Sequence, residues 1–336
     1  MLASSLLVAC AAADPSDRVP AMALGEPPGP VTLVRTARGF AGGGQDLFVP
    51  SRHTLVNGSV WIIDVRNDRL VRFDTTLGTA TALGRTGEGP GELDFALDMI
   101  VDEERLIVAE IGNSRISVFD TSGTFRTTVP SGRSPESLAR VGGVLVAATW
   151  DDAYYTHVID PEGQTTPHAR IPGVLRSLAR SDPRTYLPAG PASIASGSDG
   201  LLYVLDQSVL AVARFDEAGR LMEARLLPAP LRSRLLAQRV DDMRAWGPRA
   251  EIFVGVPATK RMSRASGPHL LVLLPLPDHW GLLIDTRDWT TRPLPLPTDP
   301  RSREILRAAG DASLYGDRLY IVDETQLHEF RADGWS

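Results

Sequence analysis

The chain has one cysteine among its 336 residues, Cys10, so no disulfide can form within it. It also has one lysine, Lys260, and its other basic residues are arginines. The formal net charge is only −6, which gives no strong field toward nucleic acid or an anionic membrane. The most apolar stretch after the N-terminus, 270–284, is interrupted by two prolines, an aspartate and a histidine, so it cannot span a bilayer as a helix. These absences exclude a disulfide-stabilised scaffold and a nucleic-acid-binding surface of high charge.

The common signatures of catalytic and cofactor sites are missing as well. None of the six histidines has the spacing typical of zinc ligands. The chain contains no G-x-S-x-G motif, no phosphate-binding loop and no dinucleotide fingerprint. The residues alone therefore predict no catalytic group and no cofactor.

What the chain does contain is a repeat. Six segments end in a short apolar strand followed by an aspartate, and in each the preceding apolar strand stops ten residues earlier. The mean spacing is about 52 residues, slightly above the ~40–50 expected for one propeller blade. The six aspartates are Asp74, Asp120, Asp160, Asp216, Asp285 and Asp333. Strand-rich repeats of this length predict an all-β fold, a six-bladed β-propeller of four-stranded antiparallel blades.

Alternation and turn residues place four strands, A to D from the channel outward, in each of the first five blades. The innermost strand of the fifth blade is expected at 251–256. The sixth blade has room for only three strands before the chain ends, and 31–36 is an unassigned strand near the other end. Pairing 31–36 onto the sixth blade would close the ring and remove an exposed edge.

The N-terminus resembles a bacterial lipoprotein signal. Leu7-Val8-Ala9-Cys10 has a small residue before the cysteine, as lipoprotein signal peptidase requires, and predicts a diacylglycerol on the Cys10 thiol. An ordinary secretory segment with a chance cysteine is the alternative. We therefore divide the chain into a signal peptide (1–9), a flexible tether (10–30) and the propeller (31–336). Ala11 after the cysteine favours the outer membrane of the cell envelope, facing the periplasm or the cell surface.

Three connections from strand D to the next strand A are long, at 172–191, 228–250 and 297–310. The second has leucines at 231, 235 and 236 followed by Val240 and Met243, separated by arginines and aspartates. That spacing predicts a helix with one buried stripe. Since D-to-A and B-to-C loops of a propeller emerge on one face, the insertions are expected around one mouth of the channel.

The segment 84–93, GRTGEGPGEL, followed by 99–120, resembles an NHL repeat, with a weaker copy at 59–74. The chain is thus similar to bacterial six-bladed propeller lipoproteins of the NHL-repeat or TolB-like type. The motif's chemistry is structural, because Arg115 can reach Glu110 across a turn and Arg69 can reach Asp64. The resemblance implies a propeller platform and leaves its ligand unnamed.

Acidic residues end strand B in four blades, at Asp64, Glu110, Asp206 and Asp323, with Asp151 one place beyond the position in the third blade. A ring of carboxylates at a propeller mouth could hold Ca²⁺. Such an ion would be catalytic in a metal-dependent lactonase or arylesterase-like hydrolase, or purely structural in the channel. Since these acids can pair with nearby arginines, we favour the interpretation in which they hold no metal ion.

Aromatic side chains in two loops suit recognition of a sugar or peptide, or packing beneath an insertion. They and their acidic neighbour form the candidate binding face: Trp150, Asp151, Tyr154, Tyr155, His279 and Trp280. The leading functional hypothesis is a monomeric, lipid-anchored, non-enzymatic propeller that binds a protein, peptide or glycan. The hydrolase is the alternative.

Overall fold

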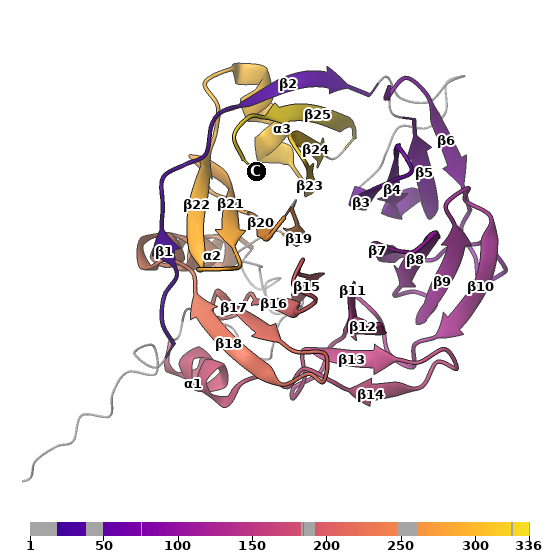
Figure 1. Cartoon of the computed structure of the whole chain (residues 1–336), viewed down its shortest axis with the longest axis horizontal. Coiled ribbons are helices and arrows are strands. Elements are labelled where there is room, and N and C mark those ends of the chain that lie inside the picture. The colour runs from indigo at the N-terminus through magenta and orange to yellow at the C-terminus, as the bar shows by residue number, and fades with distance from the viewer. Residues whose placement is uncertain are drawn as a thin grey trace, which may run out of the picture.

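The computed structural model describes residues 19–37, 50–74, 76–182, 184, 192–246, 261–265, 267–323 and 325–335. Six sheets stand around a central channel, and the innermost strand of each faces that channel (Figure 1). Every blade has four antiparallel strands, so the six-bladed β-propeller predicted from the repeat is confirmed.

The strands follow one another from the channel outward in each blade. Blade 1 consists of β3 (Pro50–Val56), β4 (Ser59–Asp64), β5 (Arg69–Phe73) and β6 (Ala80–Leu83), and blade 2 of β7 (Ala96–Asp102), β8 (Arg105–Glu110), β9 (Arg115–Asp120) and β10 (Phe125–Pro130). Blade 3 consists of β11 (Ser137–Val141), β12 (Val144–Ala148), β13 (Thr156–Ile159) and β14 (Thr165–Pro167), and blade 4 of β15 (Ser193–Ser196), β16 (Leu202–Asp206), β17 (Ala211–Phe215) and β18 (Leu221–Leu226). Blade 5 consists of β19 (Met262–Arg264), β20 (His269–Leu273), β21 (His279–Asp285) and β22 (Thr290–Pro295).

Blade 6 is built from both ends of the chain. Its strands β23 (Asp311–Tyr315), β24 (Arg318–Val322) and β25 (Leu327–Ala332) are joined on the outside by β2 (Val31–Thr36). The register of β2 on β25 pairs Val31 with Ala332 and Leu33 with Phe330. The closure predicted for 31–36 is therefore confirmed, and β25 has no free edge.

Two sequence-based boundaries need correction. The inner strand of blade 5 is β19, at 262–264, while the segment 251–256 predicted for it lies outside the described residues. The second correction concerns the tether expected over 10–30. Its part 19–30 packs on blades 4 and 5, since β1 (Ala23–Leu24) pairs in parallel with β22 and the Met22 amide donates to the Leu226 carbonyl (2.8 Å). Its part 10–18 lies outside the described residues.

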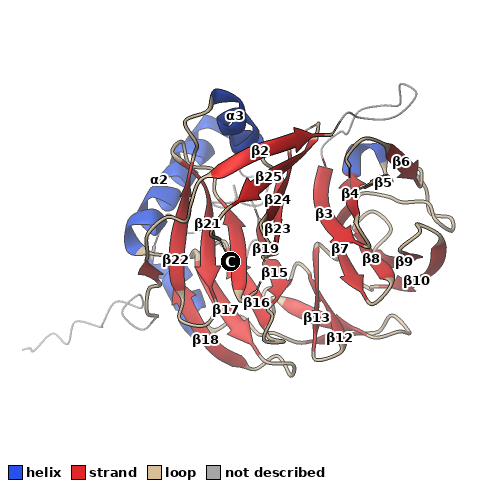
Figure 2. Ribbon diagram, turned by 45° about the horizontal axis from the view of Figure 1, so that its top comes forward, coloured by secondary structure: helices blue, strands red, loops and turns tan. Residues whose placement is uncertain are grey.

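Helices occupy the three long connections. They are α1 (Gly173–Ser181), α2 (Ala229–Trp246) and α3 (Pro300–Ala308), and a 3₁₀ turn, η2 (Val65–Asn67), follows β4. In Figure 2, α2 and α3 lie along one side of the ring, beside the strands of blade 5. Leu231, Leu235 and Leu236 of α2 are buried as predicted, whereas Val240 of the predicted stripe is half-buried and Arg239 beside it is buried. In the described part of the chain, no helix is both long and apolar enough to cross a membrane.

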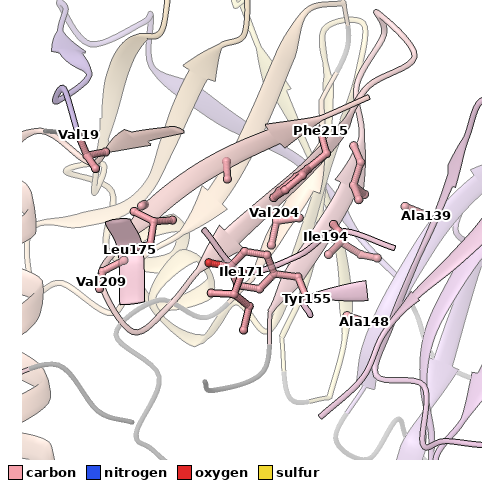
Figure 3. Close-up of a cluster of buried hydrophobic side chains, with 14 of the residues drawn as sticks. Val19, Ala139, Ala148, Tyr155, Ile171, Leu175, Ile194, Val204, Val209 and Phe215 are labelled. Carbon is pink, nitrogen blue, oxygen red and sulfur yellow. The ribbon is translucent and has the colours of Figure 1, made fainter. Parts of the chain in front are cut away.

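The core lies between neighbouring blades. Apolar side chains alternate along each strand, so one face of a blade packs on the next blade and the other face on the previous one. Figure 3 shows the cluster between blades 3 and 4, where Tyr155, Val204 and Phe215 meet Val19 from the N-terminal segment. The buried position of Val19 (3% exposed) explains why the segment before β1 is held against the ring.

Candidate functional site in the central channel

The carboxylates that end strand B in blades 1 and 2 are tied to their own turns. Asp64 accepts hydrogen bonds from Arg69 Nε (2.8 Å) and Asn67 Nδ2 (2.9 Å). Glu110 accepts from Arg115 Nε (3.0 Å) and Asn113 Nδ2 (2.6 Å). Both carboxylates are fully buried. The structural pairing expected from the NHL-like motif is therefore present.

The corresponding acids of blades 4 and 6 have local partners too. Asp206 accepts from the Tyr155 hydroxyl (2.5 Å), and burial raises the pKa of Asp206 above its usual range. Asp323 lies 2.9 Å from His328 Nε2 and accepts from the backbone N–H of Gln326. Among the residues that the structure describes, no group of three or more His, Cys, Asp or Glu could hold a metal ion. The four acids stabilise separate turns and do not converge.

The residues of the candidate binding face differ in how far their side chains are exposed. Trp150 is 42% exposed, and the carboxylate of Asp151 accepts from the Ala153 and Tyr154 amides, which fixes the loop after β12. The side chains of Tyr154 and His279 are half-buried.

Tyr155 and Trp280, in contrast, are 4% and 2% exposed. Tyr155 lies in the cluster of Figure 3, and Trp280 stacks on Trp335 with ring centroids 6.0 Å apart. These two aromatic side chains are core residues and present no surface to a ligand, so their assignment to the binding face is corrected. Their packing supplies the apolar contacts that the neighbouring blades need.

A belt of polar contacts joins the inner strands around the channel. Each contact runs from a side chain near the start of one inner strand to the backbone of the next blade. The six are Ser51 Oγ to the Ala96 carbonyl (3.5 Å), Leu138 N to Asp98 (2.7 Å), Ile194 N to Ser137 Oγ (3.5 Å), Met262 N to Ser193 Oγ (3.0 Å), Ser263 Oγ to the Ala312 carbonyl (2.6 Å) and His53 N to Asp311 (2.8 Å). The belt satisfies backbone groups at the narrowest part of the ring and fixes the blades relative to one another.

A buried charge cluster is built on this belt. Arg52 Nε lies 2.9 Å from Asp98, and Arg52 Nη1 lies 3.7 Å from Asp311. His53 Nδ1 lies 2.7 Å from the same Asp311. Although burial opposes ionisation, the nearby charges of His53 and Arg52 hold the pKa of Asp311 below its usual range. Asp98 and Asp311 thus both have ionic partners within the cluster.

Arg261 adds a second guanidinium to the cluster from blade 5. Its Nη1 lies 3.9 Å from Asp98, and its Nη2 donates to the Leu97 carbonyl (3.4 Å). Burial lowers the pKa of Arg261, and the neighbouring Arg52 charge lowers it further. The Nη1 atom of Arg261 is buried without a hydrogen-bond partner, and so is Oδ1 of Asp311.

A cavity of about 670 Å³ lies in the channel next to this cluster. All six inner strands contribute to its wall, from Arg52 and His53 near the start of β3 to Gly267 and Tyr315 at the turns that follow strand A. Trp150 does not line the cavity, so the cavity is separate from the B-to-C loop that carries it. That loop follows the end of strand B, whereas Gly267 and Tyr315 lie at the turns that precede strand B. Its size suits a small molecule or one segment of a larger ligand.

Glu136 sits just before β11, and burial raises its pKa to about 7 from 4.5. Since the pKa is higher in the folded state, the folded protein retains a proton that the unfolded chain loses, and stability falls as the pH rises from about 4.5 through 7. We expect Glu136→Gln to raise the free energy of unfolding by about 1–3 kcal/mol at pH 8 and by much less at pH 4.5. Urea denaturation at the two pH values measures this, with exposed Glu162→Gln as the control. An equal effect of Glu136→Gln at both values would contradict the assignment.

Sequence reasoning placed the site at the ends of strand B and missed the charge cluster. Arg52, Asp98 and Asp311 belong to three different inner strands and are far apart in the sequence. One signal was available: all three fall near the start of an inner strand once the blades are aligned. A ring brings such equivalent positions together at its centre.

No family model matches the chain, and no curated protein is similar enough in sequence to be matched. Solved structures do match. A protein of Bacteroides fragilis NCTC 9343 thought to be exported has a TM-score of 0.59 at 12% identity, over 92% of this chain and 99% of that one. A streptogramin B lyase has a TM-score of 0.55 at 14% identity, over 90% and 98%. Aldose sugar dehydrogenase of Streptomyces coelicolor with bound PQQ has a TM-score of 0.52 at 13% identity, over 90% and 97%. At these identities the comparisons establish the propeller fold and nothing of its activity.

Proposed function

We propose that this protein is a non-enzymatic, monomeric binding propeller of the NHL-repeat or TolB-like type, and that its ligand, a protein, peptide or glycan segment, enters the central channel. The observation that carries this proposal is the cavity of about 670 Å³ to which all six inner strands contribute. A site assembled from every blade exists only in the closed ring, as expected for a fold used as a binding platform. The exposed Trp150 at the opposite mouth is a second contact available to a large ligand.

The lipid anchor and the envelope location remain part of the proposal. The Leu7–Cys10 motif supports acylation at Cys10, and Ala11 after the cysteine favours the outer membrane. Labelled palmitate incorporated by the wild type and not by Cys10→Ala is the expected result. The lactonase alternative is not favoured, because the acids proposed to hold its metal are each tied to a separate turn.

Filling the channel should abolish ligand binding without unfolding the protein. Thr54 lines the cavity, and its hydroxyl makes only a 3.5 Å contact with the Tyr315 hydroxyl, so Thr54→Trp adds bulk where little is lost. The matched control is Thr127→Trp, at an exposed position on the outer strand β10. We expect arrays of short peptides and oligosaccharides to contain probes that bind wild type and Thr127→Trp and that Thr54→Trp no longer binds. Binding that survives in Thr54→Trp would place the site elsewhere.

A further inference from the structure

The described residues that line the cavity include two arginines and a histidine and no carboxylate. Arg52 lies at one end and Arg140 on the wall formed by β11. Their carboxylate partners, Asp98, Asp311 and Asp102, do not line the cavity, so the arginines are the charged groups at its wall. A cavity with low-dielectric walls and one sign of charge concentrates ligands of the opposite sign.

The two carboxylates of the charge cluster are engaged within it and do not line the cavity. Asp98 already accepts from the Leu138 amide, the Ser137 hydroxyl (2.8 Å) and Arg52. Asp311 is similarly engaged by Arg52 and by the backbone and ring of His53. The ring of His53 uses Nδ1 for its contact with Asp311, and its side chain is fully buried, so it offers no donor to a ligand. Among the lining arginines, Arg52 is already paired with both carboxylates, which leaves Arg140 to contact an anion.

Arg140 is the cation best placed to respond to a ligand. Its Nη2 lies 3.3 Å from Asp102, and that carboxylate is also held by Arg105 at 3.1 Å. Asp102 thus keeps a cationic partner if Arg140 turns toward a bound anion. The planar guanidinium suits a carboxylate, which it can bind through two parallel hydrogen bonds.

The rest of the wall is apolar. Leu55, Met99, Leu138 and Leu314 line the same cavity from four different blades. Such a wall binds the hydrocarbon part of a ligand and excludes water from the charged end, which strengthens the arginine–anion contact. The composition favours a molecule with one anionic end and an apolar body over a highly charged one.

We infer that the channel binds a carboxylate attached to an apolar body, with the carboxylate held by Arg140 and the body against the leucines of the wall. This inference rests on the proposed function, because it names the chemistry of the ligand that the channel would take. A peptide ending in an apolar residue and a free organic acid both present this chemistry.

The first experiment separates charge from shape. Phenylacetate and phenylacetamide have nearly the same size and differ in charge, and isothermal titration calorimetry of the full chain measures both. We expect phenylacetate to bind at least about tenfold more tightly, since a hydrogen-bonded charge pair in a partly dry site is worth about 1.5–3 kcal/mol. A phenylalanine-terminated dipeptide with a free or amidated C-terminus then distinguishes a peptide from a free acid. Equal binding of phenylacetate and phenylacetamide, or no binding of phenylacetate, would overturn the inference.

The second experiment uses two arginines that share one partner. Arg140→Gln should weaken phenylacetate binding about tenfold and leave the weak binding of phenylacetamide unchanged. Arg105→Gln is the control, because Arg105 contacts the same Asp102 with similar exposure, 46% against 40%, but does not line the cavity. Arg52 is left intact, since its removal would strip Asp98 and Asp311 of a buried cation. If Thr54→Trp blocks the amide and the acid alike while Arg140→Gln changes neither, the channel is a binding site and anion recognition is wrong.

Discussion

Replacing Glu110 with alanine is expected to destabilise the protein by about 3–5 kcal/mol, although the residue ends a strand next to a loop. The side chain of Glu110 is fully buried, and Arg115 beside it is only 13% exposed. Its carboxylate accepts from Arg115, from Asn113, from the Ser117 hydroxyl and from the Asp94 amide (3.1 Å). Alanine would leave a buried guanidinium without its counter-charge and several donors without an acceptor, which costs more than the loss of a surface ion pair.

The matched control for this substitution is Glu162→Ala. Glu162 is an exposed residue in the turn between β13 and β14, so its removal should change stability by less than about 0.5 kcal/mol. Urea denaturation of wild type and both variants measures the difference. Glu110→Gln should fall between them, because the amide oxygen still accepts hydrogen bonds while the charge is gone. A loss below 1 kcal/mol in Glu110→Ala would show that the turn does not depend on this carboxylate.

The pairing of Glu110 with Arg115 could be predicted from the sequence, whereas the burial of the pair could not. The spacing of Glu110 and Arg115 predicted the pair correctly, because residues that flank a tight hairpin turn are opposite one another. The same spacing does not show whether the pair is exposed or buried. Burial depends on what the loop before β7 does, and Arg115 Nη2 donates there to the Glu92 carbonyl (2.9 Å). That contact joins segments 23 residues apart and has no local signature.

The fold could be predicted from the sequence because a propeller repeats one local pattern of strands and turns. Strand pairs within a blade are close in sequence, so alternation and turn residues locate them, as with β4, β8 and β21. Prediction failed where the pattern was broken. The three-residue strand β19 is too short to show alternation, and the N-terminal segment binds through single side chains such as Val19.

The candidate site was less predictable than the fold for a related reason. Arg52, Asp98 and Asp311 come from three blades and meet only after the ring has closed. In the sequence their separation gives no local sign that they are partners. The sequence instead suggested a site at the ends of strand B, because acidic residues recur there at a regular interval. The structure shows that these acids recur because they stabilise the turns that follow strand B.

Ring closure gives the second large effect. Leu33→Asp, in the strand that closes blade 6, should destabilise the protein by about 2–4 kcal/mol and promote self-association. Leu33 packs against the core cluster between blades 5 and 6 and lies opposite Phe330, which is fully buried. A charge at position 33 would displace β2, uncover the apolar face of β25 and open an edge to which another chain can pair.

The neighbouring residue provides the control on the same strand. Val34 is 49% exposed and lies at an irregularity in the pairing of β2 with β25, so Val34→Asp removes no buried contact and should cost less than about 0.5 kcal/mol. Urea denaturation and size-exclusion chromatography of the two variants report stability and association together. Because side chains alternate along a strand, the two substitutions change the same β2 by the same chemistry and differ only in the face they alter. Equal stability and a monomeric state for both variants would mean that the ring is held closed without β2, by the polar belt between the inner strands alone.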